Sequence, residues 1–158
     1  MFKYIYLNMK ILVCGLPDTG KTYLTERIIK HIDNVCWFNA DKVRGMVNDW
    51  DFSDKGRMRQ SERMKTFADF ESKHGRIVIC DFIAPTNRTR ELFDADFKIW
   101  MNTHTKSKYE NTNKIFEEPS DCNIVIRKYL SDDEILDVIG VIKIFIEKQK
   151  NKKNRLII

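Results

Sequence analysis

Short apolar runs alternate with helix-like patterns along the chain. Residues 10–14 read KILVC, a run short and apolar enough for a buried strand. In residues 21–32, which follow, Leu24, Ile28 and Ile32 recur every four residues and so share one face of a helix. The chain is therefore predicted to open with a strand and a helix.

The same alternation continues to the C-terminal end. Further apolar runs predict strands at residues 35–38, 76–81, 97–101 and 122–126. Helical spacing predicts a helix near Asp41, a long one over 54–73, a short one over 88–94, and a last one that opens with Ser131 and Glu134 at capping-box spacing. Strands and helices in this order predict an α/β fold of three layers, with a five-stranded, mainly parallel sheet between helices.

Residues 102–121 read NTHTKSKYENTNKIFEEPSD and show no clear period. So long an irregular segment in a compact domain is usually a functional loop or lid, and we expect a lid over about residues 103–121. Neither an internal repeat nor a linker interrupts the pattern, so we expect a single domain over residues 1–158.

Composition narrows the class of protein. Hydrophobic residues make up 42% and charged residues 32%, which is typical of a globular protein and excludes a disordered or membrane chain. Cys14, Cys36, Cys80 and Cys122 form no C-x-x-C pair, and no signal peptide is apparent, so we expect reduced cysteines and a cytoplasmic location. The net charge of +5 is concentrated in a basic C-terminal helix end, which the helix dipole favours, so a nucleic-acid partner is not expected. A homodimer stays open.

The strongest motif is GLPDTGKT, which matches the phosphate-binding P-loop pattern G-x-x-x-x-G-K-[ST]. Its glycines let the backbone approach phosphates, Lys21 neutralises the β- and γ-phosphates, and Thr22 offers a hydroxyl to magnesium. A strand precedes the motif and a helix follows, as a P-loop fold requires. We expect ATP and Mg²⁺ here, with the nucleotide held by Gly15, Leu16, Pro17, Asp18, Thr19, Gly20, Lys21 and Thr22.

A P-loop alone leaves GTPases, ATPases and kinases open. The short chain and the absence of an Asn-Lys-x-Asp guanine-reading sequence favour a kinase. Residues 38–64 (FNADKVRGMVNDWDFSDKGRMRQSERM) start where the second strand ends, which is where an α/β sheet presents side chains to a ligand. They suit an anionic, ring-bearing acceptor because they contain a carboxylate, two arginines, an amide and two aromatic residues: Asp41, Arg44, Arg57, Asn48, Trp50 and Phe52.

In these residues the chain resembles the adenylylsulfate kinases, which phosphorylate the 3′-hydroxyl of adenosine 5′-phosphosulfate with MgATP. The family pattern D-G-D-N-V-R-x-G-L-N-x-D-L-G-F-S is matched in part by NADKVRGMVNDWDFS from Asn39, and F-I-S-P is matched in part by FIAP from Phe82. The resemblance covers roughly the first two thirds of the chain, in unbroken order.

The resemblance implies a role for each matching position. Lys21 and Asp41 would be catalytic, and Thr22, Asp41 and Asp81 would lie at the magnesium. Arg44 and Arg57 would hold the phosphosulfate, and Phe52 would stack on the acceptor adenine. The acceptor pocket would also include Asn48, Gln60, Ile83, Ala84, Lys114 and Phe116.

Several positions depart from the family pattern. Gln60 replaces an asparagine and Ala84 replaces a serine. Asp81 replaces a small residue and is either a second magnesium-associated carboxylate or a strand-end residue hydrogen-bonded to the phosphate loop. The acceptor could therefore be another nucleotide, a sugar acid or a nucleic-acid end, or the chain could be a non-catalytic nucleotide-binding module.

The expected lid is shorter than in the family, and its arginine has no counterpart. Lys114-Ile115-Phe116 could match the family's K-x-F, which would place Phe116 over the acceptor adenine, opposite Phe52. Alternatively, residues 116–119 (FEEP) match the later Y-E-x-P. In either alignment Lys106, Lys108 or Lys114 would have to neutralise the negative charge on the transferred phosphoryl group.

Overall fold

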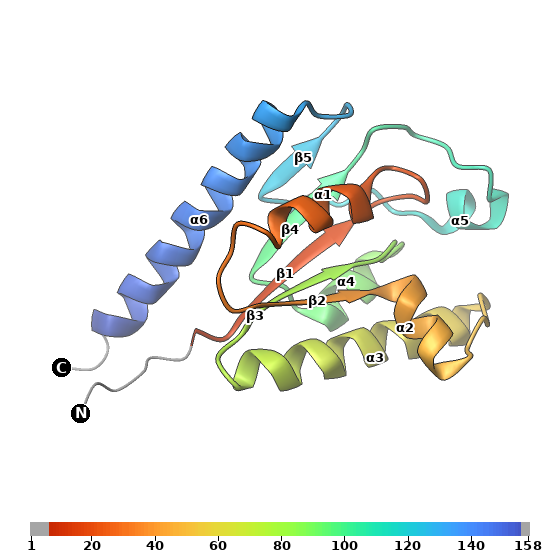
Figure 1. The fold of residues 1–158 in the computed structure, drawn as a ribbon. Coiled ribbons are helices and arrows are strands. Elements are labelled where there is room, and N and C mark those ends of the chain that lie inside the picture. Colours follow the sequence, from red (N-terminus) through yellow and green to blue (C-terminus); the bar gives the residue numbers. More distant parts are fainter. Residues whose placement is uncertain (1–6, 156–158) are drawn as a thin grey trace.

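The computed structural model describes residues 7–155 and contains a five-stranded sheet at its centre (Figure 1). The strand order is β2-β3-β1-β4-β5, and every neighbouring pair is parallel. The bounds are β1 Met9–Cys14, β2 Val35–Asn39, β3 Ile77–Asp81, β4 Phe97–Met101 and β5 Ile124–Ile126. All six residues of β1 are buried, which explains its continuous apolar run, since a central parallel strand is covered on both faces.

Helices cover both faces of this sheet, which confirms the predicted three-layer α/β fold (Figure 1). One face packs against α1 (Lys21–Ile28) and α6 (Asp132–Arg155), through Leu24, Ile28 and the isoleucines of α6. The other face packs against α2 (Ala40–Val47), α3 (Asp54–Lys73) and α4 (Asn87–Phe93). None of the helices in the described part of the chain is long and apolar enough to cross a membrane.

Two predicted boundaries differ from the structure by more than one residue, and one predicted loop differs in kind. Helix α1 ends at Ile28 rather than Ile32, because the amide of His31 donates to Ile28 O in a tight turn (3.0 Å). Strand β5 begins at Ile124 rather than at residue 122. The segment expected to be irregular contains a short helix, α5 (Glu110–Ile115), which at six residues is too short to show a helical period.

Parallel pairing brings the carboxyl ends of the central strands to one edge of the sheet. There the amide of Phe82 donates to Val13 O (3.1 Å), and the amide of Gly15 donates to Ile83 O (3.4 Å). Gly15 has a φ of +146°, and a Cβ at this position would lie 2.3 Å from the carbonyl oxygen of Met101. Only glycine therefore fits where the chain leaves β1 and enters the phosphate loop.

Candidate active site

The phosphate loop connects β1 to α1 and is closed by hydrogen bonds to its own backbone. Lys21 Nζ donates to Leu16 O (2.6 Å), and Thr19 Oγ1, which is fully buried, donates to the same oxygen (2.9 Å). Gly20, with a φ of +93°, precedes the first turn of α1. Burial lowers the pKa of Lys21 to about 8, although the nearby carboxylate of Asp81 favours its charged form.

Asp81, at the end of β3, is buried and accepts three hydrogen bonds. Thr22 Oγ1 and Asn39 Nδ2 donate to Oδ2 (2.8 and 3.0 Å), and Trp37 Nε1 donates to Oδ1 (2.7 Å). Burial raises the pKa of Asp81, and these donors oppose that rise. The bond from Thr22 ties this strand-end residue to the phosphate-loop motif, and a role for Asp81 at a magnesium ion stays a prediction. Asn39 and Trp37 were not among the predicted site residues.

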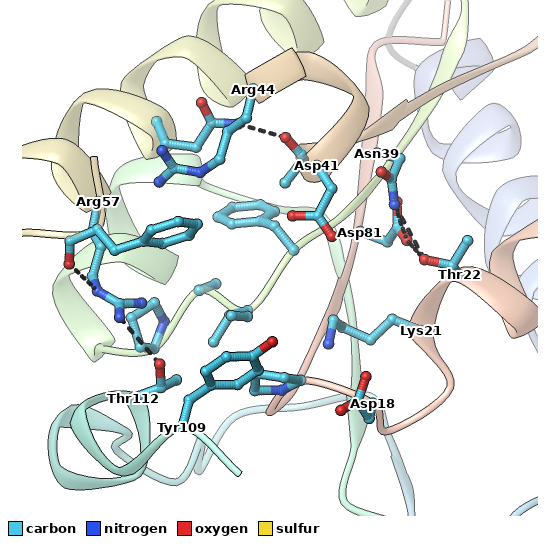
Figure 2. Close-up of a pocket in the computed structure, with 18 of the residues that line it drawn as sticks. Asp18, Lys21, Thr22, Asn39, Asp41, Arg44, Arg57, Asp81, Tyr109 and Thr112 are labelled. Atoms are coloured by element: carbon cyan, nitrogen blue, oxygen red, sulfur yellow. Dashed lines mark hydrogen bonds between the residues drawn. The ribbon is translucent and has the colours of Figure 1, made fainter. Parts of the chain in front are cut away.

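Asp41 and Arg44 come from α2, whose start is capped by Asn39 Oδ1 accepting from the amide of Lys42 (3.0 Å). Asp41 is exposed and points into the space between Arg44 and Lys21 (Figure 2). Arg44 is buried, and its Cζ lies 4.6 Å from the centre of the Phe52 ring. Its Nη1 donates to the carbonyl oxygens of Asp49 (2.8 Å) and Asp51 (3.1 Å), so this arginine also holds the loop that carries Phe52.

Asp49 fixes the same loop to α3, a role that the sequence analysis missed. Arg59 Nε and Arg63 Nη2 both donate to Asp49 Oδ2, at 2.8 and 2.9 Å. These arginines hold the pKa of Asp49 well below its usual range. Asp49 lies within the segment that resembles the family pattern, so its position carried a signal that could have been used. The loop between α2 and α3 is thus tied down at both ends of the Phe52 segment.

Residues 103–121, the segment predicted to be a lid, fold back toward Arg57 and the phosphate loop. Arg57 Nη2 donates to Thr112 Oγ1 of α5 (3.1 Å), while Arg57 Nε donates to Phe52 O (2.9 Å). Tyr109, just before α5, points toward Lys21 and Asp18 across the cavity (Figure 2). Near the start of the segment, Thr103 Oγ1 donates to Thr19 O at 3.0 Å. The segment is therefore bonded to both the phosphate loop and Arg57.

One cavity of about 1000 Å³ joins the phosphate loop to Arg44, Phe52 and Arg57. The predicted residues on its wall are Pro17, Asp18, Gly20, Lys21, Thr22, Asp41, Arg44, Phe52, Arg57, Gln60, Asp81, Ile83 and Ala84. Gln60 Nε2 donates to Ala40 O (3.0 Å), which orients its amide. The wall also includes residues that the sequence analysis did not single out: Tyr23, Asn39, Ala40, Ser61, Phe82, Pro85, Tyr109, Glu110, Asn111 and Thr112.

Comparison with known proteins decides the family. Residues 8–113 match the family model of adenylylsulphate kinase. The chain belongs to this family. The search of curated proteins found no significant match to this chain.

Solved structures share the fold of this adenylylsulfate kinase family member. APE1195 superposes with a TM-score of 0.75 at 21% identity, covering 91% of this chain and 99% of that one. The Mycobacterium tuberculosis APS kinase CysC in complex with AMPPNP and APS gives a TM-score of 0.69 at 16% identity, over 85% of this chain and 97% of that one. A gluconokinase from Sinorhizobium meliloti 1021 gives 0.60 at 12% identity, over 96% and 97%. These likenesses establish a P-loop kinase fold.

The other predicted site residues lie away from the cavity of this family member. Gly15, Leu16 and Thr19 are buried within the phosphate loop, and Asn48 ends α2 in a left-handed conformation (φ +48°). Lys114 is exposed on α5.

Phe116 packs against the core beside α4, 5.9 Å from Cζ of Arg90, rather than opposite Phe52. Its position follows from the next residue, because the amide of Glu117 donates to Pro85 O (2.8 Å) and Arg90 Nη2 donates to Glu117 O (2.7 Å). Tyr109 and Thr112 line the cavity, and Phe116 is not among its lining residues.

Proposed function

We propose that this chain transfers the γ-phosphoryl group of ATP to the 3′-hydroxyl of adenosine 5′-phosphosulfate. The observation that carries the proposal is the single cavity shared by Lys21 and Thr22 on one side and by Arg44, Phe52 and Arg57 on the other. A donor phosphate and an anionic acceptor would meet in this space, with Asp41 between them (Figure 2). Membership of the adenylylsulfate kinase family supports the same reaction.

The donor half suits ATP. The amides at the start of α1 and the charge of Lys21 would bind its phosphates. Beside Gly20 lies a second, smaller pocket of about 260 Å³, lined by Tyr23, Leu24, Met101, Tyr129, Leu130 and Ile135. Its aromatic and aliphatic walls suit a nucleobase. Tyr129 Oη donates to Asp18 O (3.0 Å), which connects this pocket to the phosphate loop.

The residues at the phosphate loop fit a magnesium ion. Thr22 offers a hydroxyl, and Asp41 and Asp81 offer carboxylates. Oδ2 of Asp81 lies 2.8 Å from the Thr22 hydroxyl. These are the hard oxygen ligands that Mg²⁺ prefers. When bound, the ion would offset negative charge on the β- and γ-phosphates. We propose that Asn39 and Trp37 position Asp81 for this role, since both donate to it.

The acceptor half provides charge, an aromatic face and a carboxylate. Only Nη1 of Arg44 is hydrogen-bonded within residues 7–155, so Nε and Nη2 remain for an anionic acceptor. Arg57 would add a second cation and Phe52 a face for the adenine. Asp41 would orient the acceptor hydroxyl and take its proton as the phosphoryl group arrives.

A coupled assay with ATP, MgCl₂ and adenosine 5′-phosphosulfate tests the reaction. Lys21→Met should lower turnover by at least about 100-fold, because the transferred phosphoryl group loses its cation. Arg57→Ala should raise the KM for the acceptor by about tenfold or more and leave the KM for ATP nearly unchanged. Arg88→Ala, an exposed arginine on α4, is the matched control and should behave as wild type. Binding of ATP without transfer to this acceptor would overturn the assigned substrate.

A different acceptor is the second candidate, and the lid segment favours it. Glu110 and Thr112 line the cavity, and their carboxylate and hydroxyl suit a polyol better than a phosphosulfate. The same assay with other nucleotides, sugar acids and nucleic-acid ends compares these acceptors directly. Turnover with none of them, despite ATP binding, would indicate a non-catalytic nucleotide-binding module.

A further inference from the structure

Asp18 has a strained backbone in the middle of the phosphate loop. Its φ is +63°, in the left-handed region that residues other than glycine seldom adopt. Aspartate and asparagine tolerate this region better than most residues, but only glycine adopts it without strain. An outlier of this kind at a candidate active site calls for a functional reason for the side chain.

Bonds from outside the loop hold this strained conformation. Three consecutive carbonyl oxygens of the loop, those of Pro17, Asp18 and Thr19, accept hydrogen bonds from distant side chains. In the same order, the donors are His104 Nε2 (2.9 Å), Tyr129 Oη (3.0 Å) and Thr103 Oγ1 (3.0 Å). These bonds fix the backbone at residue 18 and thereby the point at which its side chain leaves the loop.

The carboxylate of Asp18 belongs to the cavity. Asp18 is exposed and is one of the residues that line the cavity. Figure 2 shows it on the other side of Lys21 from Asp41 and Asp81. Within residues 7–155 no hydrogen bond or salt bridge involves its carboxylate, because the bond from Tyr129 goes to the main chain. The negative charge of Asp18 is therefore open to a ligand in the cavity.

This charge has the wrong sign for a loop that binds phosphates. Burial lowers the pKa of Lys21 to about 8, and three nearby carboxylates oppose that fall: Asp81, Asp41 and Asp18. Asp41 and Asp81 belong to the proposed magnesium site, where a bound ion would offset their charge. Asp18 lies outside that site, so phosphates at the loop meet its charge directly. The resulting repulsion is proportional to the negative charge of the ligand.

We propose that Asp18 determines which form of ATP the donor site accepts: its carboxylate repels metal-free ATP and so favours ATP that carries a divalent cation. One bound Mg²⁺ cancels about half of the negative charge of ATP. The repulsion from Asp18 is then about half as large for MgATP as for metal-free ATP. The inference rests on the proposed function in its choice of ATP as the donor, and it is independent of the acceptor.

Isothermal titration calorimetry of the full chain with metal-free ATP, in the presence of EDTA, and with MgATP tests this role. Asp18→Asn keeps the size of the side chain and tolerates the left-handed backbone, so it removes mainly the charge. Its Kd for metal-free ATP should be about tenfold lower than that of the wild type. Its Kd for MgATP should fall only about threefold, since half the repulsion energy corresponds to the square root of the factor.

Asp94→Asn is the matched control. Asp94 is also an exposed aspartate with a left-handed backbone (φ +55°), but it ends α4 and does not line the cavity. Its substitution should leave both Kd values unchanged. Asp18→Gly removes the strain together with the charge and should favour metal-free ATP in the same way as Asp18→Asn. Circular dichroism would show that each variant is folded.

Salt separates repulsion from a change in backbone conformation. Raising the salt from about 0.05 M to about 0.5 M should reduce the advantage of Asp18→Asn for metal-free ATP, because ions screen an exposed charge. An equal Kd of wild type and Asp18→Asn for metal-free ATP, or a gain that salt does not reduce, would overturn the role of Asp18. If neither protein bound ATP with or without magnesium, the proposed donor would be wrong, and this inference would fall with it.

Discussion

Asp81 and Trp37 show how closely the chemistry of single residues depends on their neighbours. Asp81 is 2% exposed, and burial by itself favours its protonated form. The proposed magnesium site beside Thr22, however, requires the ionised carboxylate. The indole of Trp37 donates to one carboxylate oxygen, and Thr22 and Asn39 donate to the other. These donors stabilise the ionised form.

Trp37→Phe should therefore shift the pH dependence of catalysis. The substitution keeps an aromatic ring and removes one donor, so the pKa of Asp81 should rise further. As the pH is lowered, turnover of the variant should begin to fall at a higher pH than turnover of the wild type. Near neutral pH its turnover should be severalfold lower than that of the wild type. The measurement is turnover against pH at saturating ATP and magnesium. Trp50→Phe, at an exposed tryptophan in the loop between α2 and α3, is the control and should leave the acidic side of the profile in place.

At the scale of elements, the loop between α2 and α3 is the part of the site held by the most side-chain bonds. Arg44 bonds to two of its carbonyl oxygens, and Asp49 bonds to Arg59 and Arg63 of α3. Phe52, which is half exposed to the cavity, depends on these bonds for its position. A rigid aromatic face binds a nucleobase with less loss of entropy than a mobile one.

Asp49→Ala should loosen this loop without touching the phosphate loop. We expect the KM for the acceptor to rise about three- to tenfold while the KM for ATP stays near its wild-type value. Asp54→Ala, at the exposed start of α3, removes a carboxylate from the same region and is the control. Equal increases in both KM values would show instead that Asp49 supports the whole site.

The elements differ in how far their sequences determine them. The strands and the long helices were predictable, because continuous apolar runs mark buried strands and apolar residues at helical spacing mark the buried face of a helix. Thr22, Asp41 and Arg57 were found through motifs. The path of the predicted lid segment was not predictable, because it depends on bonds between residues distant in sequence, such as that from Thr103 to Thr19. Trp37 was missed although it lies two residues before Asn39, on the same side of β2, since nothing in the sequence marks Asp81 as its partner.

At the scale of the whole molecule, the charge of Lys21 acts against folding. Burial lowers its pKa in the folded protein to about 8, against 10.5 for the ordinary side chain. At neutral pH both the folded and the unfolded chain carry the proton, and the folded chain has less water around the charge. Each pKa unit corresponds to about 1.4 kcal/mol, so the cost could reach about 3 kcal/mol.

Lys21→Met should therefore stabilise the protein at pH 7 while it abolishes transfer. As the pH rises from about 8 to about 10.5, the folded wild type loses the proton that the unfolded chain still holds, so the wild type regains stability relative to the variant. The measurement is the free energy of urea unfolding of both proteins at pH 7 and at about pH 9.5. Lys30→Met, at an exposed position after α1, should change stability little at either pH. If the gain in unfolding free energy of Lys21→Met shrinks at the higher pH, the buried charge is its cause. If the gain is the same at both pH values, its cause is the added apolar side chain.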